Sequence, residues 1–286
     1  MKESHQFTYL ILLLLKKWIS FLSPKSRYSL AIYLASFFYR NISLRQELVR
    51  ENIKKAFPNW GPKKIESTIE KTYQFFFNNF IQFISIPKSW EDLEINVIGK
   101  NILDKSMTKG KGIILISGHF GAWEILGKWV AQHVPLFTGI AHKQKNVGAN
   151  RFFQEQRELP GTKHIFKKEP IKKMYEVLTQ NGILGLVSDQ DAKQKGVFVN
   201  FFGIPASTPK GAAMFHLKTG APIIIGVCMK TGFQKYQIEF LPVHSLKKDV
   251  QSITQAYTTL LESFIKQYPE QYFWFHRRWK TKRMIK

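Results

Sequence analysis

The chain has 286 residues, enough for one large domain or two modest ones, and 44% of them are apolar, which is ample for a buried core. Its 43 Lys and Arg against 20 Asp and Glu give a formal charge of +23, which indicates an anionic partner: nucleic acid, an anionic membrane surface, or an acidic protein or phosphorylated substrate. The single cysteine, Cys228, excludes an internal disulfide and is typical of a protein that faces the cytosol.

The first 90 residues have the pattern of helices, and the earliest are strongly apolar. Phe7–Leu15 stops at Lys16 and Lys17, so it is shorter than the roughly 20 apolar residues of a spanning helix unless Trp18–Leu22 extends it. Tyr28–Tyr39 is a second apolar helix that lies between two arginines. We expect both helices to lie at a membrane interface, the first with shallow or spanning insertion; the alternative is an ordinary helical hairpin. The 14% content of aromatic residues suits such an interface better than a nucleic-acid module.

Two more helices are expected at 43–58 and 62–77, and from Glu94 onward short apolar runs alternate with amphipathic helices. The expected strands are Gly112–Ser117, Leu136–Ala141, Lys163–Phe166, Ile183–Ser188, Pro222–Met229 and Tyr236–Leu241. The expected helices are Trp123–His133, Ala149–Leu159, Ile171–Gln180, Lys210–Thr219 and Val250–Gln267. This alternation predicts an α/β fold with a mostly parallel central sheet flanked by helices. We therefore divide the chain into an N-terminal helical membrane-associated region, 1–90, and an α/β domain, 91–286.

A titratable pair follows the strand predicted at 112–117. His119 and Glu124 lie where that strand meets a helix, which is where ligands and chemistry collect in α/β sheets. An imidazole whose tautomer is held by a carboxylate can take a proton from a hydroxyl near neutral pH. The pattern G-x-S-x-G is absent, which favours a hydroxyl that belongs to the substrate. The alternative is that His119 caps the strand and Glu124 complements the helix dipole.

Charged residues also follow two other predicted strands. Lys143 comes after the strand at 136–141 and precedes a helix that carries Arg151 and Arg157. Because these arginines are six residues apart, they fall on partly different faces, and one can point inward while the other is solvated. Asp189 follows the strand at 183–188, again at a carboxyl end.

The C-terminal run 271–280, QYFWFHRRWK, combines aromatic residues with His276, Arg277 and Arg278. Such a run offers apolar contact together with a bidentate grip on phosphate. The sequence contains no H-E-x-x-H, cysteine cluster, calcium loop, P-loop or dinucleotide fingerprint, so we predict neither a metal nor a cofactor. Basic residues are spread through the chain without a nucleic-acid-binding motif, so we predict no nucleic-acid partner.

The stretch His119–Glu124, HFGAWE, resembles the H-x-x-x-x-[D/E] signature of the lysophospholipid acyltransferase superfamily. Its glutamate resembles that of the lipid A late-acyltransferase branch, the lauroyl and myristoyl transferases of Gram-negative bacteria. Further agreements follow in the family's order over nearly the whole chain: Asn52 with Ala56-Phe57-Pro58, Ser188-Asp189-Gln190-Asp191, Val197–Gly203 with Thr208, and Pro269–Lys280.

The resemblance implies an acyltransferase domain at 91–286 and transfer of an acyl chain from a thioester to a hydroxyl of a lipid A precursor. The usual donor is acyl carrier protein, and the location implied is the cytoplasmic face of the inner membrane, with the N-terminal helices anchored in or peripheral to it. It implies His119 as general base, Glu124 as its orienting carboxylate, and Arg157 and Asp189 as positions tied to activity. We assign substrate contacts to Lys143, Arg151, His276, Arg277 and Arg278.

Two departures and two alternatives accompany this resemblance. Many relatives carry Arg-Pro where this chain has Lys143-Gln144, and the F-P-E-G-[ST] block of glycerophosphate acyltransferases is absent. One alternative function is acylation of another glycolipid, such as a phosphatidylinositol mannoside. The other is a non-enzymatic basic protein that binds membranes or nucleic acid.

Overall fold

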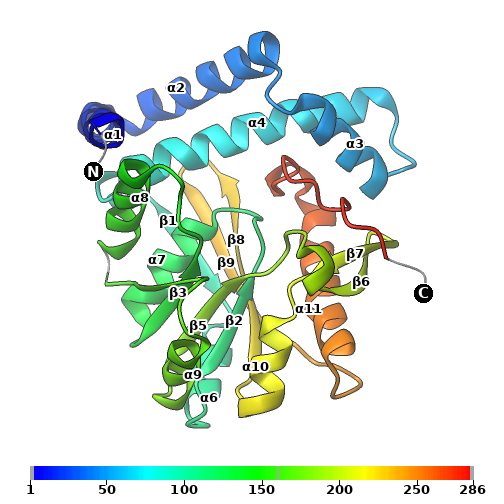
Figure 1. Ribbon diagram of the computed structural model, residues 1–286. Helices are drawn as coiled ribbons and strands as arrows, with labels where there is room; N and C mark the ends of the chain where they lie inside the picture. The colour runs from blue at the N-terminus through cyan, green and yellow to red at the C-terminus, as the bar shows by residue number, and fades with distance from the viewer. Residues whose placement is uncertain (1–2, 160, 284–286) are drawn as a thin grey trace.

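The computed structural model describes residues 3–159 and 161–283, and it begins with an all-helical segment. This segment contains α1 (Glu3–Phe21), α2 (Pro24–Phe37), a π-helical turn (Phe38–Ile42), α3 (Gln46–Ala56), α4 (Pro62–Ile84) and the short α5 (Lys88–Glu91). The expectation of helices through the first 90 residues is confirmed. In Figure 1, α2 and α4 lie side by side across one end of the central sheet.

Local sequence explains where these helices begin. Ser23 caps α2, since its side chain accepts a hydrogen bond from the backbone N–H of Ser26, and Pro24 occupies the first turn, where no N–H is needed. Pro62 plays the same part in α4. That helix runs seven residues beyond the predicted end at Phe77 because the aromatic patch that follows keeps helical spacing and is partly buried.

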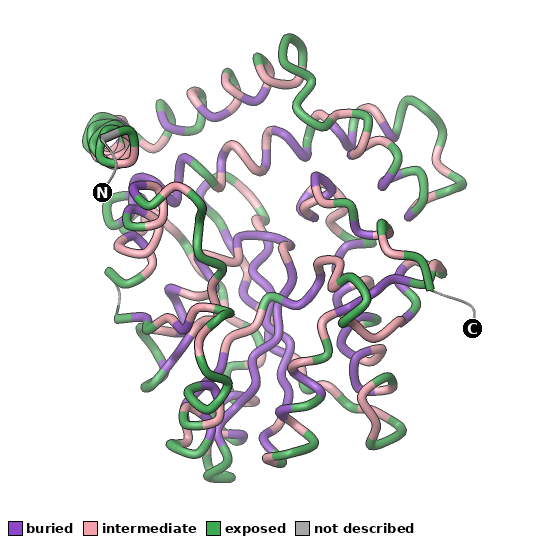
Figure 2. The backbone as a smooth tube through the Cα atoms, viewed as in Figure 1, coloured by how far each residue is buried: buried purple, intermediate pink, exposed green. Residues whose placement is uncertain are grey.

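A seven-stranded sheet forms the centre of the described chain, in the order β1-β9-β8-β2-β5-β3-β4. The strands are β1 (Glu94–Ile98), β2 (Ile113–Ser117), β3 (Phe137–Ala141), β4 (Lys163–Phe166), β5 (Ile183–Val187), β8 (Ile223–Gly232) and β9 (Lys235–Pro242). All neighbouring pairs are parallel except the β8–β9 hairpin. Figure 2 shows β2 and its neighbours as the buried centre of the molecule. The predicted mostly parallel α/β sheet is therefore confirmed.

Helices cover both faces of the sheet. On one face α6 (Lys100–Met107) and α7 (Trp123–His133) pack against a cluster that includes Ile113 and Leu115. On the other, α9 (Ile171–Thr179), α10 (Gly211–Thr219) and α11 (Val250–Gln267) pack against a cluster that includes Ile114 and Ile116. α8 (Val147–Glu158) lies against α1, as Figure 1 shows. Because every residue of β2 is buried, this strand holds a fixed position for whatever follows its carboxyl end.

Three strands were not expected from the sequence. β1 is an edge strand, and β6 (Val197–Phe201) and β7 (Ile204–Thr208) form a separate hairpin. Its two turn residues, Phe202 and Gly203, both have positive φ, of 54° and 74°. A two-residue turn with positive φ at both positions is usually Asn-Gly, so the sequence Phe-Gly did not indicate a hairpin here. The hairpin packs on α11 and on the C-terminal segment.

From the sequence, the first helix could insert into a membrane either shallowly or across the bilayer. α1 is 19 residues long, and among the helices of the described ranges none combines the length and the apolar character needed to cross a bilayer.

Candidate active site

The loop that carries His119 is held by backbone hydrogen bonds from two distant segments. From the C-terminal segment, Phe273 N donates to the His119 carbonyl oxygen at 2.9 Å, and the Gln271 carbonyl oxygen accepts from Gly121 N at 2.8 Å. From β8, the Cys228 carbonyl oxygen accepts from Ala122 N at 2.7 Å. The aromatic C-terminal run therefore acts as a clamp on the loop.

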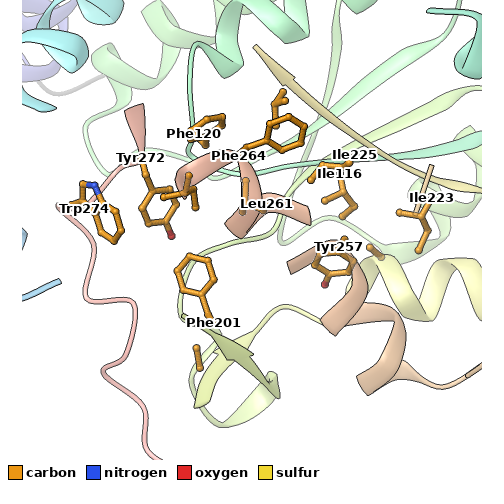
Figure 3. Packing of buried hydrophobic residues seen from close by; sticks show 14 of the residues in the cluster. Ile116, Phe120, Phe201, Ile223, Ile225, Tyr257, Leu261, Phe264, Tyr272 and Trp274 are labelled. Atoms are coloured by element: carbon orange, nitrogen blue, oxygen red, sulfur yellow. The ribbon is translucent and has the colours of Figure 1, made fainter. Parts of the chain in front are cut away.

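Gly121 is required by this close approach. Its φ of +61° favours glycine, and a Cβ atom there would overlap the carbonyl oxygen of Cys228. Behind the loop, Phe120 pairs with Tyr272 in an isolated antiparallel bridge and packs on Phe264 of α11. Figure 3 shows these rings gathered between α11 and the C-terminal segment. The loop thus has little freedom to move, which fixes the His119 side chain.

The carboxylate that faces His119 is Asp189. The His119 Nδ1 atom lies 2.7 Å from Asp189 Oδ1, and Asp189 is buried at the carboxyl end of β5, the strand paired with β2. An ionised carboxylate only accepts, so Nδ1 carries the proton and Nε2 presents its lone pair. The side-chain amide of Gln190 lies 3.4 Å from that Nε2 atom. The expectation that Glu124 holds the His119 tautomer is therefore corrected: Asp189 occupies that place.

The pKa values of this pair move in opposite directions. Burial alone lowers the pKa of His119, but the charge and hydrogen bond of Asp189 outweigh it, so the His119 pKa is raised above its ordinary value. Burial alone raises the pKa of Asp189, but His119 outweighs it and the Asp189 pKa is lowered. Asp189 therefore remains ionised, and an imidazole paired with a carboxylate in this way can accept a proton.

Glu124 instead binds Arg157. The Nη2 atom of Arg157 lies 2.6 Å from Glu124 Oε1, and its Nε atom lies 3.1 Å from each carboxylate oxygen. The Trp123 indole N–H also donates to Glu124, at 3.3 Å. Burial alone raises the pKa of Glu124, but Arg157 outweighs it and the Glu124 pKa is lowered. Of the two arginines on α8, Arg157 points inward, and Arg151 is solvated and pairs with Glu155 at 2.8 Å.

Two cavities meet at this ion pair. The larger, which we call the His119 cavity, has a volume of about 630 Å³, and the smaller, the aromatic cavity, about 430 Å³. Both fall within the range of small-molecule sites. The lining of the aromatic cavity includes seven aromatic residues, Phe76, Phe80, Phe83, Trp90, Trp123, Phe153 and Phe273. Because Glu124 and Arg157 line both cavities, the ion pair forms part of the boundary between them.

The predicted substrate-contact residues are dispersed. Lys143 is exposed, although its neighbours His142 and Gln144 line the His119 cavity. Arg151 lines neither cavity, and Arg277 is exposed on the C-terminal segment. His276 is half-buried, and its carbonyl oxygen accepts a hydrogen bond from Asn52.

Arg278 was predicted to grip phosphate, and the structure corrects this. Its side chain is 2% exposed and donates to the Ser207 carbonyl oxygen at 2.7 Å and to Thr208 Oγ1 at 2.5 Å. Its guanidinium also lies over the ring of Phe201. Arg278 therefore joins the C-terminal segment to the β6–β7 hairpin, and its side chain has no access to a ligand in solution.

Replacing the two adjacent arginines separates these roles. Arg278→Ala removes two hydrogen bonds from a buried site and leaves the Ser207 carbonyl oxygen with only the long bond from Ala192 N, at 3.4 Å, so we expect a loss of about 1–3 kcal/mol in the free energy of unfolding. Arg277→Ala, at an exposed position, should change it by less than about 0.5 kcal/mol. Urea denaturation followed by tryptophan fluorescence measures both values. Equal effects from the two substitutions would contradict the structural assignment of Arg278.

Two residues of the site were not predicted. Asn79 of α4 donates from its side-chain amide to the Gly121 carbonyl at 3.2 Å, and Gln271 exchanges two hydrogen bonds with the backbone of Lys230 in β8. Gln271 is the first residue of the aromatic run 271–280, so that motif could have drawn attention to it. Nothing in the sequence around Asn79 distinguishes it from a residue on a solvated helix face.

Comparison with known proteins identifies the family of the chain. The family model for the bacterial lipid A biosynthesis acyltransferase matches residues 2–281, nearly the whole chain. The chain belongs to this family. The resemblance inferred from His119–Glu124 and the other motifs is thereby confirmed.

Relatives fall into two groups by name. A phosphatidylinositol mannoside acyltransferase of Mycolicibacterium smegmatis is 28% identical over 190 residues, which cover 65% of this chain and 62% of that protein. A lipid A biosynthesis lauroyltransferase of Escherichia coli is 25% identical over 264 residues, 89% of this chain and 85% of its own. The lipid A biosynthesis palmitoleoyltransferase of the same organism is 20% identical over 246 residues, which cover 83% of this chain and 79% of that protein. The chain thus spans less than two thirds of the mycobacterial relative and most of the two enterobacterial ones.

Proposed function

We propose that this protein transfers a fatty acyl chain from an acyl thioester, carried by acyl carrier protein, to a hydroxyl of a lipid A precursor. The observation that carries the proposal is the His119–Asp189 pair, which lies beside a cavity of about 630 Å³. The Nε2 atom of His119 makes only a long contact, 3.4 Å, with the Gln190 amide. Membership of the family supports the class of reaction. The surplus of 23 positive charges suits an anionic carrier protein, anionic lipid and a phosphorylated acceptor.

In the proposed mechanism, His119 Nε2 removes the proton of the acceptor hydroxyl as its oxygen attacks the carbonyl carbon of the thioester. A C–O bond forms, the C–S bond breaks, and the departing thiolate takes the proton from His119, so that the enzyme returns to its starting state. Asp189 holds the tautomer and stabilises the transient imidazolium, as the carboxylate does in a hydrolase triad. The Glu124–Arg157 pair lines the cavity that contains His119, and we propose that Arg157 stabilises the developing oxyanion.

Direct transfer needs no nucleophile on the enzyme. Cys228 is buried, and burial raises the pKa of its thiol, so the thiol stays protonated and is a poor nucleophile. Intact-protein mass spectrometry after mixing with donor alone tests this step. A stable acyl adduct on any side chain would contradict direct transfer.

The outward side of α1 supports association with a membrane. Phe7, Leu10, Leu14, Trp18 and Phe21 recur every three or four residues and are all exposed. On the inward side, Tyr9 donates to Glu155 at 2.7 Å and Lys16 donates to Gln156 at 2.5 Å, which ties α1 to α8. A helix with its apolar stripe outward and basic residues beside it lies well in an anionic interface. We therefore propose that the protein binds peripherally, through α1, to the cytoplasmic face of the inner membrane.

Replacing Leu14 with glutamate tests this attachment. Burial of one leucine contributes about 1.5–3 kcal/mol, and a carboxylate is repelled by anionic lipid, so we expect Leu14→Glu to weaken binding to anionic vesicles roughly tenfold or more. The matched control is Gln6→Glu, which adds the same charge at an exposed position off the stripe. Vesicle co-sedimentation measures both. Equal partitioning of wild type and Leu14→Glu would contradict the assignment of this face.

The acceptor is tested by supplying two candidates. A phosphatidylinositol mannoside is the second, because the mycobacterial relatives that carry this name are 28% identical to the chain. Purified protein is mixed with acyl carrier protein thioesters and each acceptor, and products are identified by mass spectrometry. Acylation of the lipid A precursor supports the proposal. Acylation of the mannoside alone would show that the mannoside, and not the lipid A precursor, is the acceptor. Absence of both products, together with salt-sensitive binding to anionic vesicles or polynucleotides that His119→Ala does not change, would favour a non-enzymatic basic protein. Product formation that His119→Ala does not change would remove His119 from the mechanism.

A further inference from the structure

The His119 cavity extends over both faces of the sheet. In a strand, successive side chains face opposite sides, and paired residues of neighbouring strands face the same side. The register places Gly185 of β5 beside Leu115 of β2 and beside Gly139 of β3. These three residues line the cavity from the side of α7, whereas Ile140 and Leu186, one position further along their strands, line it from the opposite side. The cavity therefore has one limb on each face.

The limb beneath α7, which we call the α7 slot, is bordered by three glycines. Gly139 and Gly185 lie side by side on two central strands, and Gly127 of α7 lines the same cavity. None of them places a side chain between helix and sheet, and neighbouring rings lie over the two strand glycines: His164 over Gly139 and Phe137 over Gly185. Both strand glycines are partly exposed although Leu115 beside them is buried. This corridor consequently leads from the carboxyl edge of the sheet, where His119 lies, into the core.

The ring of Phe137 closes the inner end of the slot. Phe137 is the first residue of β3, but its ring reaches Gly185, whose register partner Gly139 is two positions and about 7 Å from Ala141 at the carboxyl edge. A Cβ atom on Gly185 would lie 2.7 Å from the Cε2 atom of this ring, and one on Gly127 would lie 3.9 Å from Cε1. The ring thus lies in the space between the glycine of the strand and the glycine of the helix.

We propose that Phe137 determines the length of the acyl chain that the enzyme transfers, with Gly185 making room for the Phe137 ring and Gly127 leaving the slot open on the side of the helix. This inference rests on the proposed acyl transfer. A thioester carbonyl beside His119 Nε2 places its chain at the mouth of the slot, and the end of the chain meets the Phe137 ring. The limb on the other face is bordered by exposed Ile171, so it sets no fixed end for a chain. The aromatic cavity is the competing location, and it reaches the surface at Phe80.

The experiment measures chain-length preference in competition. The protein receives an equimolar mixture of saturated acyl carrier protein thioesters that differ by two carbons, together with the acceptor, and products are quantified by mass spectrometry. Phe137→Ala deepens the slot and should move the preference to a longer chain by at least two carbons. Gly127→Ala adds a methyl group in the slot and should move it to a shorter chain, with roughly tenfold discrimination against the original one. Alanine is also the better helix former, so Gly127→Ala should fold even if Phe137→Ala does not.

Phe80→Ala, in the aromatic cavity, is the matched control and should leave the preference unchanged. A shift caused by Phe80→Ala and not by the slot variants would overturn the inference and place the chain in the aromatic cavity. Unchanged preference in active Gly127→Ala would also overturn it, because the added methyl group would then lie outside the path of the chain. Failure of wild type to transfer any chain would overturn the proposed function instead, so the two failures are distinct.

Discussion

Asp189→Asn should lower kcat by about 10³- to 10⁴-fold and leave the KM for the acyl donor nearly unchanged. The carboxylate accepts from His119 Nδ1 at 2.7 Å and so leaves Nε2 as the base. An asparagine presents an amide group that can donate to Nδ1 and favour the wrong tautomer, a change that costs about 10⁴-fold in a hydrolase triad. Steady-state kinetics with a single acyl carrier protein thioester measures the effect.

The same substitution should move the pH profile in a known direction. A general base must be unprotonated, so kcat/KM falls as the pH drops through the His119 pKa. Asp189 holds that pKa above its ordinary value, so the wild-type acid limb should lie above about pH 6.5. Without the carboxylate, burial lowers the pKa, so the acid limb of Asp189→Asn should shift to lower pH.

The variant Asp189→Glu is the matched control, since it keeps the charge and displaces the carboxylate by one methylene. We expect it to retain a raised acid limb and to recover part of kcat. Wild-type kcat in Asp189→Asn, or an acid limb that does not move, would remove Asp189 from the proposed mechanism.

Much of the fold could be predicted because its elements carry local signals. The buried runs at β2 and β5 and the amphipathic helices α7 and α11 follow directly from periodicity. β6 and β7 could not be predicted this way, because their burial depends on α11 and Trp279, which are distant in sequence. The end of α4 was also missed, since its last turns are stabilised by tertiary contacts that a local pattern does not contain.

The structure brings together the four residues that the sequence predicted as catalytic, but not in the expected pairs. His119, Glu124, Arg157 and Asp189 all lie at the carboxyl edge of the sheet, as expected from the strands they follow. The sequence spacing suggested that His119 pairs with Glu124, five residues away. The fold instead brings Asp189 to His119 across adjacent strands, 70 residues apart. A contact between side chains that follow two different strands depends on which strands are neighbours in the sheet, and local sequence motifs do not give the strand order.

The aromatic C-terminal run shows a related limit. Dense aromatics with two adjacent arginines suggested a ligand-binding surface. The structure buries Tyr272, Trp274 and Arg278 and uses their segment to clamp the His119 loop. Composition alone cannot separate a binding surface from a clamp, because both need aromatic contacts and hydrogen-bond donors.

The Glu124–Arg157 pair gives the second large expected effect, which is a loss of both stability and turnover from either single substitution. Glu124→Gln leaves the Arg157 guanidinium in a largely enclosed site without its carboxylate, and Arg157→Met does the same to Glu124. We expect each to lower the free energy of unfolding by about 1–3 kcal/mol. Because the pair lines the wall beside His119, we also expect kcat to fall about 10²-fold through misplacement of the substrate.

The double variant Glu124→Gln/Arg157→Met separates the two effects. Replacing a buried ion pair by groups without charge is often neutral or stabilising, so the double variant should regain most of the stability lost by each single variant. Turnover should stay low, since neither a carboxylate nor a guanidinium is then present at the boundary of the two cavities. Urea denaturation and steady-state kinetics on all four proteins give the coupling in each quantity. Recovery of turnover together with stability would show that the pair acts only by holding α7 and α8 together, and it would exclude Arg157 from the stabilisation of an oxyanion.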